Sequence, residues 1–193
     1  QLLFEKNIIA LNVLDYYFIN TVIYTSLFFE KSSEQDMHRD TPYFCTKPEY
    51  KYMGFWIALE DTNEFNGTLK VVRGAHNLPE LDRIEIAKMF YDDINKINPY
   101  DIRLWEEYQK RLKVQYENAG LNEEVIFLKK GDTVIWHAQT PHGAVNIKDQ
   151  SKTRLSFVMH VTPKYTPVYQ QDIFFSKKNT LLQPKWNHSK IKQ

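Results

Sequence analysis

Residues 124–161 decide the fold class, and they read EVIFLKKGDTVIWHAQTPHGAVNIKDQSKTRLSFVMHV. Short runs of β-branched and aromatic residues are separated here by segments rich in glycine, lysine, aspartate and asparagine. This spacing is typical of antiparallel strands joined by turns, because a helix needs a longer apolar repeat with a period near 3.6. The predicted strands of this half cover residues 124–128, 133–136, about 142–145 and 153–161.

The preceding half of the chain has the same pattern, with predicted strands at residues 21–29, around His38, 52–60 and 68–72. Residues 79–120 differ, because apolar side chains recur there at helical spacing among many charges. Pro99 divides this segment into two predicted helices, and Gly120 follows the second as a C-terminal cap. A weaker helical pattern covers residues 7–18. About eight short strands with one helical excursion therefore predict a mainly β jelly roll with a helical insertion at about 79–120.

The composition excludes several functional classes. Lys and Arg number 25 and Asp and Glu number 24 among 193 residues, so the net charge is +1. We expect no nucleic-acid partner, because phosphate contacts require a basic excess. The single cysteine, Cys45, rules out an internal disulfide framework and favours a reducing, cytoplasmic location. We also expect no membrane span and a single domain over residues 1–193, with a small-molecule site where the strand ends meet.

The sequence Gln35-Asp36-Met37-His38-Arg39-Asp40 contains a possible pair of metal ligands. In an extended chain, residues two apart point to the same face, so His38 and Asp40 present an imidazole and a carboxylate side by side. Together with a distant second histidine they form a two-His-one-carboxylate triad, which is the donor set of non-haem Fe(II) oxygenases. A His-x-Asp sequence alone is common, so the third ligand decides whether this interpretation holds.

The segment Trp136-His137-Ala138-Gln139-Thr140-Pro141-His142-Gly143 offers two candidates for the third ligand. We favour His142, because it follows a proline at the start of a predicted strand, where a side chain reaches a shared site. His137 is the second choice, and His76, which ends a turn, is the third. We expect His137 and His160 to be dispensable for metal binding.

Arg154 is predicted to lie within the apolar strand at 153–161. An arginine in a buried strand needs an anionic partner, because an unpaired buried charge is costly, and its planar fork matches a carboxylate. Ser156 is two residues further along and faces the same way. The partner is either one of the chain's own acids or the carboxylate of a co-substrate.

At this point the sequence resembles a known family, the phytanoyl-CoA dioxygenase-like Fe(II)- and 2-oxoglutarate-dependent oxygenases. The similar segments are 32–40 (SSEQDMHRD), 56–61 (WIALED), 66–76 (NGTLKVVRGAH), 130–137 (KGDTVIWH), 141–143 (PHG) and 153–156 (TRLS). Their order and spacing agree with the family over about residues 20–163. The combination is specific, although each segment alone is weak.

The resemblance implies a double-stranded β-helix that binds Fe(II) through His38, Asp40 and His142. It also implies that Arg154, aided by Ser156, binds 2-oxoglutarate, and that Gln35 contacts this co-substrate or a metal-bound water. The expected reaction uses O₂ and hydroxylates a small organic or lipid-like substrate with release of succinate and CO₂. Asp40 favours hydroxylation over halogenation, because halogenating relatives replace this carboxylate with a small residue. Part of the family's N-terminal helical layer is expected to be missing.

Two other functions remain open from the sequence alone. One is a non-catalytic jelly-roll binding module, in which the His38 and Asp40 side chains belong to an ordinary loop. The other is a cupin-like metal-dependent isomerase, which shares the metal but does not need Arg154. The sequence indicates neither the substrate nor the oligomeric state.

Overall fold

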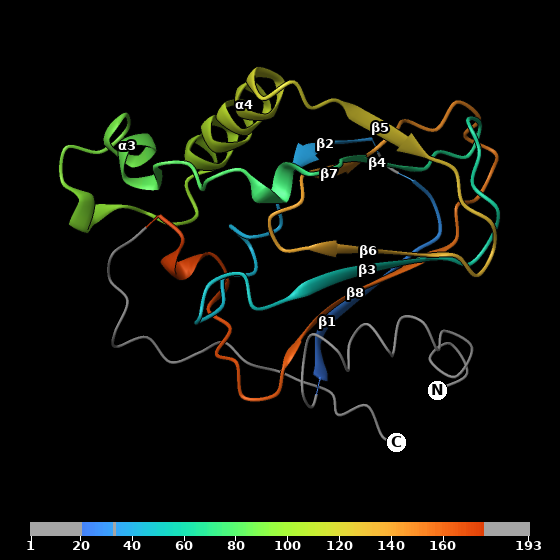
Figure 1. Ribbon diagram of the computed structural model, residues 1–193, viewed down its shortest axis with the longest axis horizontal. Coiled ribbons are helices and arrows are strands. Elements are labelled where there is room, and N and C mark those ends of the chain that lie inside the picture. Colours follow the sequence, from blue (N-terminus) through green and yellow to red (C-terminus); the bar gives the residue numbers. More distant parts are fainter. Residues whose placement is uncertain (1–20, 33, 176–193) are drawn as a thin grey trace.

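Two four-stranded antiparallel sheets face each other in the computed structural model, which describes residues 21–32 and 34–175 (Figure 1). The first sheet has the order β1 (Thr21–Phe29), β8 (Ser156–Pro163), β3 (Met53–Ala58) and β6 (Thr133–His137). The second has the order β2 (Gln35–His38), β7 (His142–Ala144), β4 (Leu69–Val72) and β5 (Glu123–Ile126). The helix predicted at residues 7–18 lies outside the described residues.

Successive strands switch between the two sheets, which is the connectivity of a double-stranded β-helix. From β1 to β4 each strand lies in the sheet opposite to its predecessor, and the same holds from β5 to β8. The helical insertion separates β4 from β5. The predicted fold class is therefore confirmed, with the excursion between the fourth and fifth strands. The prediction of a single domain over residues 1–193 stays a prediction.

Apolar side chains from both sheets pack together on their facing sides. One buried cluster joins Trp56, Trp136 and Val158 of the first sheet to Leu69 of the second. On β3 the even-numbered residues belong to this cluster, while Phe55 and other odd-numbered residues pack with the opposite face of the same sheet. This alternation follows from the period of two in a strand, and it turns one face of β3 and β8 towards the second sheet.

The insertion consists of helices, as the spacing of its apolar residues predicts. Its elements are the 3₁₀ helix η1 (Ala75–Asn77), α3 (Arg83–Lys88), the 3₁₀ helix η2 (Ile94–Lys96) and α4 (Ile102–Asn118), and a last 3₁₀ helix, η3, covers Gln170–Ile173. Figure 1 shows α4 between the strands and α3. The buried residues of α4 are four apart: Leu104, Tyr108, Leu112 and Tyr116. Gly120 ends α4 with a φ of 72°, and Leu121 N–H donates to the Tyr116 carbonyl, so the predicted glycine cap is present.

A buried arginine ties the insertion to the segment that carries the first two predicted metal ligands. Arg39 is fully buried, and its guanidinium donates to the carbonyls of Gln139 and Ala75. It also lies 3.5 Å from the Glu80 carboxylate, which accepts a hydrogen bond from the Tyr108 hydroxyl of α4. Arg39, which lies between His38 and Asp40 in the sequence, therefore contacts three separate segments of the chain. These contacts restrict the backbone of its two neighbours.

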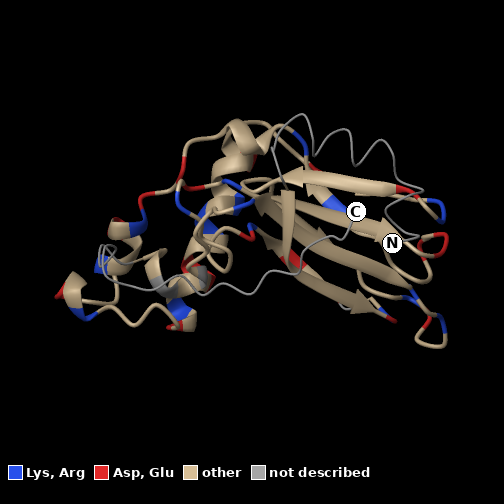
Figure 2. Cartoon of the chain, turned by 90° about the horizontal axis from the view of Figure 1, so that it is seen from below, with Lys and Arg blue, Asp and Glu red and all other residues tan. Residues whose placement is uncertain are grey.

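Charged residues lie mainly in the loops and on the helices, and the two signs are interspersed there (Figure 2). This distribution agrees with the near-zero net charge of the sequence. Among the described residues, no helix is both long enough and apolar enough to cross a membrane.

Candidate metal centre and active-site pocket

Antiparallel pairing of β2 with β7 brings the first and third predicted ligands together. His38 is directly opposite His142 in this pairing, and their ring centroids are 4.6 Å apart. Gly143 makes the close approach possible, because a Cβ at this position would lie 2.5 Å from the Gln35 carbonyl oxygen. The glycine that follows His142 thus has a structural reason, because a side chain at this position would prevent β7 from pairing with β2.

Asp40 follows β2 and completes the group. Its backbone carbonyl accepts hydrogen bonds from the N–H groups of Tyr43 and Phe44, so the chain turns immediately after the carboxylate. The Nε2 atom of His38 lies 3.7 Å from Asp40 Oδ1, and that of His142 lies 3.4 Å from Asp40 Oδ2. One ligand atom from each of the three residues lies within 4.8 Å of the other two, and all three side chains are buried. This arrangement suits a metal ion.

Backbone carbonyls fix the tautomers of both histidines. The Nδ1 atom of His38 lies 2.7 Å from the Asp36 carbonyl oxygen, and that of His142 lies 3.0 Å from the Thr140 carbonyl oxygen. A carbonyl oxygen only accepts, so each Nδ1 must carry the proton and donate it. Each Nε2 then keeps its lone pair and faces Asp40, as a histidine ligand requires.

His160 and Trp136 also contact Asp40, and the sequence analysis assigned neither of them a role. The Nε2 atom of His160 lies 2.8 Å from Asp40 Oδ2, and Trp136 Nε1 donates to the same oxygen at 3.3 Å. A signal for His160 was present in the sequence, because Ser156, Val158 and His160 alternate along one strand and share one face. The three-residue metal group does not include His160.

The buried environment shifts the pKa values of the site in opposite directions. Burial alone would raise the pKa of the Asp40 carboxyl, but the nearby His142, His160 and His38, with the His160 hydrogen bond, hold it well below its usual range. Burial lowers the pKa of His142 to about 4 despite the attraction of Asp40. The carboxylate is therefore charged and the His142 imidazole is neutral near pH 7, which are the forms that bind a metal.

Gly54 provides the space that Trp136 occupies beside this group. A Cβ at Gly54 would lie 2.1 Å from the Trp136 side chain, whose ring centroid is 4.5 Å from that of His142.

We expect Gly54→Ala to lower the free energy of unfolding by about 1–3 kcal/mol through overpacking and also to weaken metal binding. Urea unfolding and metal titration measure the two effects. Ile57→Val, on the opposite face of β3, is the control and should change stability alone; equal metal affinity of both variants would contradict the prediction.

The ligand group opens into a pocket of about 1090 Å³ between the sheets and α4. A pocket of this size accommodates a small co-substrate together with a second organic molecule. The side chains that α4 contributes to its wall are Trp105, Glu106, Gln109, Lys110 and Lys113. The helical insertion therefore borders this pocket through α4.

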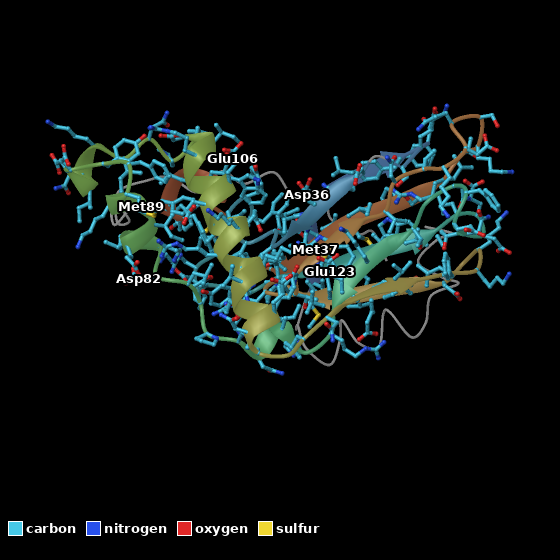
Figure 3. All side chains as sticks on the ribbon, turned by 90° about the horizontal axis from the view of Figure 1, so that it is seen from above. Asp36, Met37, Asp82, Met89, Glu106 and Glu123 are labelled. Carbon is cyan, nitrogen blue, oxygen red and sulfur yellow. The ribbon has the colours of Figure 1, made fainter. Side chains whose placement is uncertain are left out.

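Three elements around the pocket carry charged or flexible lining residues that Figure 3 labels. Asp36 and Met37 belong to β2, Glu106 to α4 and Glu123 to β5, and all four line the pocket. Among the pocket residues of α4, Trp105 lies beside a predicted metal ligand: its ring centroid is 6.1 Å from that of His38. The wall thus combines an aromatic surface near the ligands with charged groups of both signs.

Arg154 lies in the same pocket but not within a strand. β8 begins at Ser156, so the predicted strand at 153–161 starts too early; the Arg154 N–H donates instead to the Glu30 carbonyl just beyond β1. The guanidinium carbon is 5.4 Å from the centroid of the Trp56 ring. Burial lowers the pKa of Arg154 to about 10, and no described carboxylate offsets this effect.

Arg154 and Ser156 hold buried polar atoms that lack partners. Among residues 21–32 and 34–175, neither Nε nor Nη1 of Arg154, nor Oγ of Ser156, has a hydrogen-bond partner. Leaving such donors unsatisfied costs free energy, so their presence needs an explanation. The structural ion pair that was one explanation for Arg154 does not occur within the described part of the chain. A carboxylate ligand in the pocket fits the free donors of Arg154, which lines it.

The other predicted residues lie as follows. Gln35 is exposed and lines the pocket from β2. His137 accepts a hydrogen bond from the Gln139 N–H through Nδ1, and its ring lies 5.8 Å from that of His76. Neither His76 nor His137 belongs to the metal group or lines the pocket, so the structure brings His142, and not the two alternatives, to Asp40.

Residues 4–154 match the family model described as Phytanoyl-CoA dioxygenase (PhyH). The chain belongs to this family. It is 27% identical over 123 residues to "Phytanoyl-CoA dioxygenase, peroxisomal" of Bos taurus, which covers 63% of this chain and 32% of that protein. It is 28% identical over 148 residues to "Phytanoyl-CoA dioxygenase domain-containing protein 1" of Danio rerio, covering 72% of this chain and 45% of that protein.

The chain covers only part of these relatives, and its fold is also similar to that of a solved structure. The aligned part of this PhyH-family chain spans about a third of the bovine protein and less than half of the zebrafish protein. Among solved structures, the "non-heme alpha ketoglutarate dependent epimerase SnoN from nogalamycin biosynthesis" superposes with a TM-score of 0.58 at 19% identity, covering 91% of this chain and 61% of that chain. This likeness supports the double-stranded β-helix fold.

Proposed function

We propose that this PhyH-family chain is a non-haem Fe(II)- and 2-oxoglutarate-dependent dioxygenase that hydroxylates a small organic or lipid-like substrate. The observation that carries the proposal is one buried pocket with two complementary features. It is lined by the His-Asp-His group and by Arg154, two of whose guanidinium nitrogens lack partners among the described residues. A binding module needs neither feature, and a metal-dependent isomerase does not need the second.

The donor set fits Fe(II). Two neutral imidazole nitrogens and one carboxylate oxygen form the facial triad that leaves open positions on this metal. His38, Asp40 and His142 would hold the ion, with the Asp36 and Thr140 carbonyls fixing the two imidazoles through their Nδ1–H groups. The charged carboxylate also offsets one unit of the metal's charge in a buried site.

The unpartnered donors fit a dicarboxylate co-substrate. Arg154 would bind the carboxylate of 2-oxoglutarate that is remote from the metal, because its planar fork pairs with a carboxylate through two parallel hydrogen bonds. Ser156 Oγ would donate to the same group, and Gln35, at the pocket edge on β2, would contact the co-substrate or a water. Burial of Arg154 strengthens this charged contact by excluding competing water.

When bound, Fe(II) and 2-oxoglutarate supply oxidative decarboxylation of the keto acid by O₂ to succinate and CO₂, coupled to insertion of one oxygen atom into a substrate C–H bond. The chain's own residues bind, orient and exclude water. Trp105 and the other α4 residues would hold the substrate beside His38. Hydroxylation is the proposed reaction because Asp40 is present and faces both histidines. The fold alone does not fix the reaction, since SnoN is described as an epimerase.

The proposed location is the cytoplasm, on the ground of the single cysteine. Cys45 is buried and forms no disulfide among the described residues, which suits a reducing compartment. The bovine relative is described as peroxisomal. Fractionation of cells that express the natural protein decides between the two locations.

Thermal unfolding with Mn(II) and 2-oxoglutarate tests the proposed function. A ligand that binds only the folded state adds about 2.7 kcal/mol of stability at a hundred times its dissociation constant. We expect Mn(II) to raise the melting temperature and 2-oxoglutarate to raise it further only when Mn(II) is present. Stabilisation by metal without an effect of 2-oxoglutarate would favour the isomerase, and no response to either would favour the binding module.

A further inference from the structure

We propose that His160 is a positioning residue that, together with Trp136, holds the Asp40 carboxylate so that it binds the metal through one oxygen only. The inference rests on the proposed function, because it concerns how the metal site is shaped. It goes beyond the ligand set by assigning a role to a buried histidine on β8 that is not itself a ligand.

Two hydrogen-bond donors contact the same oxygen of Asp40, Oδ2. His160 Nε2 lies 2.8 Å from this oxygen, and a carboxylate oxygen only accepts, so Nε2 carries the proton. Trp136 Nε1 donates to the same oxygen at 3.3 Å. A carboxylate oxygen has two lone pairs in its plane, so these two donors occupy both. Oδ1 then keeps its lone pairs for the metal; His38 Nε2 lies 3.7 Å from this oxygen, and His142 Nε2 lies 3.4 Å from Oδ2.

The second step concerns the rigidity of His160. Its side chain is nearly fully buried on β8, which lies between β1 and β3. Its ring stacks on Phe44 with a centroid distance of 4.2 Å and an interplanar angle of 30°, and Tyr24 and Tyr52 lie beside it at 5.9 and 5.8 Å. The donor is therefore fixed in space and does not follow Asp40 if the carboxylate rotates.

The third step concerns the cost of placing a histidine here. His160 Nδ1 is buried and has no hydrogen-bond partner among the described residues. An apolar ring would fill the same aromatic surroundings without this unsatisfied nitrogen. The histidine is thus explained by its other nitrogen, whose bond to Asp40 is the one polar contact that the structure gives its side chain within the described chain.

The consequence is a defined number of open metal positions. Two histidines and one carboxylate oxygen occupy three positions of an octahedral ion, which leaves three for exogenous ligands. A carboxylate that binds through both oxygens would take a fourth. Outer partners of this kind also raise metal affinity by holding the ligand in its binding geometry.

Glutamine and asparagine substitutions separate this role from a purely structural one. The amide nitrogen of Gln lies near the position of histidine Nε2, whereas that of Asn lies near Nδ1. His160→Gln should therefore keep the hydrogen bond to Asp40, and His160→Asn should lose it. Circular dichroism and thermal unfolding establish that each variant is folded before metal is added.

The readouts are Co(II) affinity and the Co(II) visible spectrum, whose bands shift when a second carboxylate oxygen replaces a water on the ion. We expect the Co(II) affinities of wild type and His160→Gln to agree within about threefold, and His160→Asn to bind Co(II) about tenfold more weakly and with shifted bands. A folded His160→Asn with wild-type affinity and spectrum would overturn the inference. If His160→Asn does not fold, Trp136→Phe, which removes the second donor, must show the same spectral change, and an unchanged spectrum would overturn the inference. Failure of the wild type itself to bind Co(II) would instead contradict the proposed function.

Discussion

Arg154→Gln should weaken 2-oxoglutarate binding by about 2–5 kcal/mol, the usual cost of truncating one partner of a buried charged contact. This corresponds to a loss of affinity between about thirtyfold and several thousandfold. The reason is that Gln removes the positive charge and one branch of the fork, so the co-substrate carboxylate loses its charged partner at a buried position. Calorimetric titration of the Mn(II)-loaded protein with 2-oxoglutarate measures the change, and Mn(II) affinity should not change.

Arg73→Gln is the matched control for this experiment. Arg73 is 78% exposed in its side chain and pairs with Glu124 at the surface, away from the pocket lining. The same change of charge there should leave the 2-oxoglutarate affinity within about twofold, because exposed ion pairs contribute little. If Arg154→Gln behaves like Arg73→Gln, Arg154 does not bind the co-substrate.

His142→Ala should lower the affinity for Fe(II) by about a hundredfold or more, because it removes a direct ligand and even an outer partner contributes ten- to a hundredfold. His38→Ala and Asp40→Ala should have effects of the same size. Anaerobic equilibrium dialysis against Fe(II), followed by metal analysis, measures all three affinities. The folded state of each variant is checked beforehand by circular dichroism.

His137→Ala is the control, since His137 is the nearby histidine that the sequence offers as the alternative third ligand. Its side chain points to His76 and Gln139 and not to Asp40. We expect this variant to retain full stoichiometric iron. Loss of iron from His137→Ala with retention by His142→Ala would mean that the third ligand has been assigned to the wrong residue.

The strands and the paired ligands could be predicted from the sequence because both depend on local periodicity. The alternation of apolar residues predicts the strands β3, β6 and β8. The spacing of two residues predicts that the side chains of His38 and Asp40 lie together. The opposition of His38 and His142 depends instead on the register between β2 and β7, which no local pattern contains. The position of His142 after Pro141, at the start of a predicted strand, favoured it over His137 and His76, and the resemblance to the family implied the same residue.

His160 was missed for the same kind of reason. The alternation along β8 indicates that it faces inward, but its contact with Asp40 depends on where β8 lies relative to the turn after β2. The expectation that His160 is dispensable for metal binding stays untested, and the geometry now favours the opposite. The start of β8 was also wrong, because the Arg154 N–H pairs beyond the end of β1 and not within the ladder.

The spacing of apolar residues in the insertion predicts its helices but not which helical residues line the pocket. It predicts α4 and its cap, but it does not separate Trp105 from Tyr108, which are three residues apart on the same helix. Trp105 lines the pocket, whereas Tyr108 is fully buried and donates to Glu80. The difference arises from which side of α4 meets β2, a tertiary contact that the pattern does not encode.

Anaerobic absorption spectroscopy tests the central claim, that the His-Asp-His group and Arg154 serve one Fe(II)- and keto-acid-binding site. A keto acid that chelates Fe(II) through its carboxylate and keto oxygens gives a visible metal-to-ligand charge-transfer band, which neither component gives alone. We predict that this band appears when 2-oxoglutarate is added to the Fe(II)-loaded chain. It should be absent from Asp40→Ala and should require much higher 2-oxoglutarate in Arg154→Gln. Stoichiometric Fe(II) binding with no band at saturating 2-oxoglutarate would contradict the account.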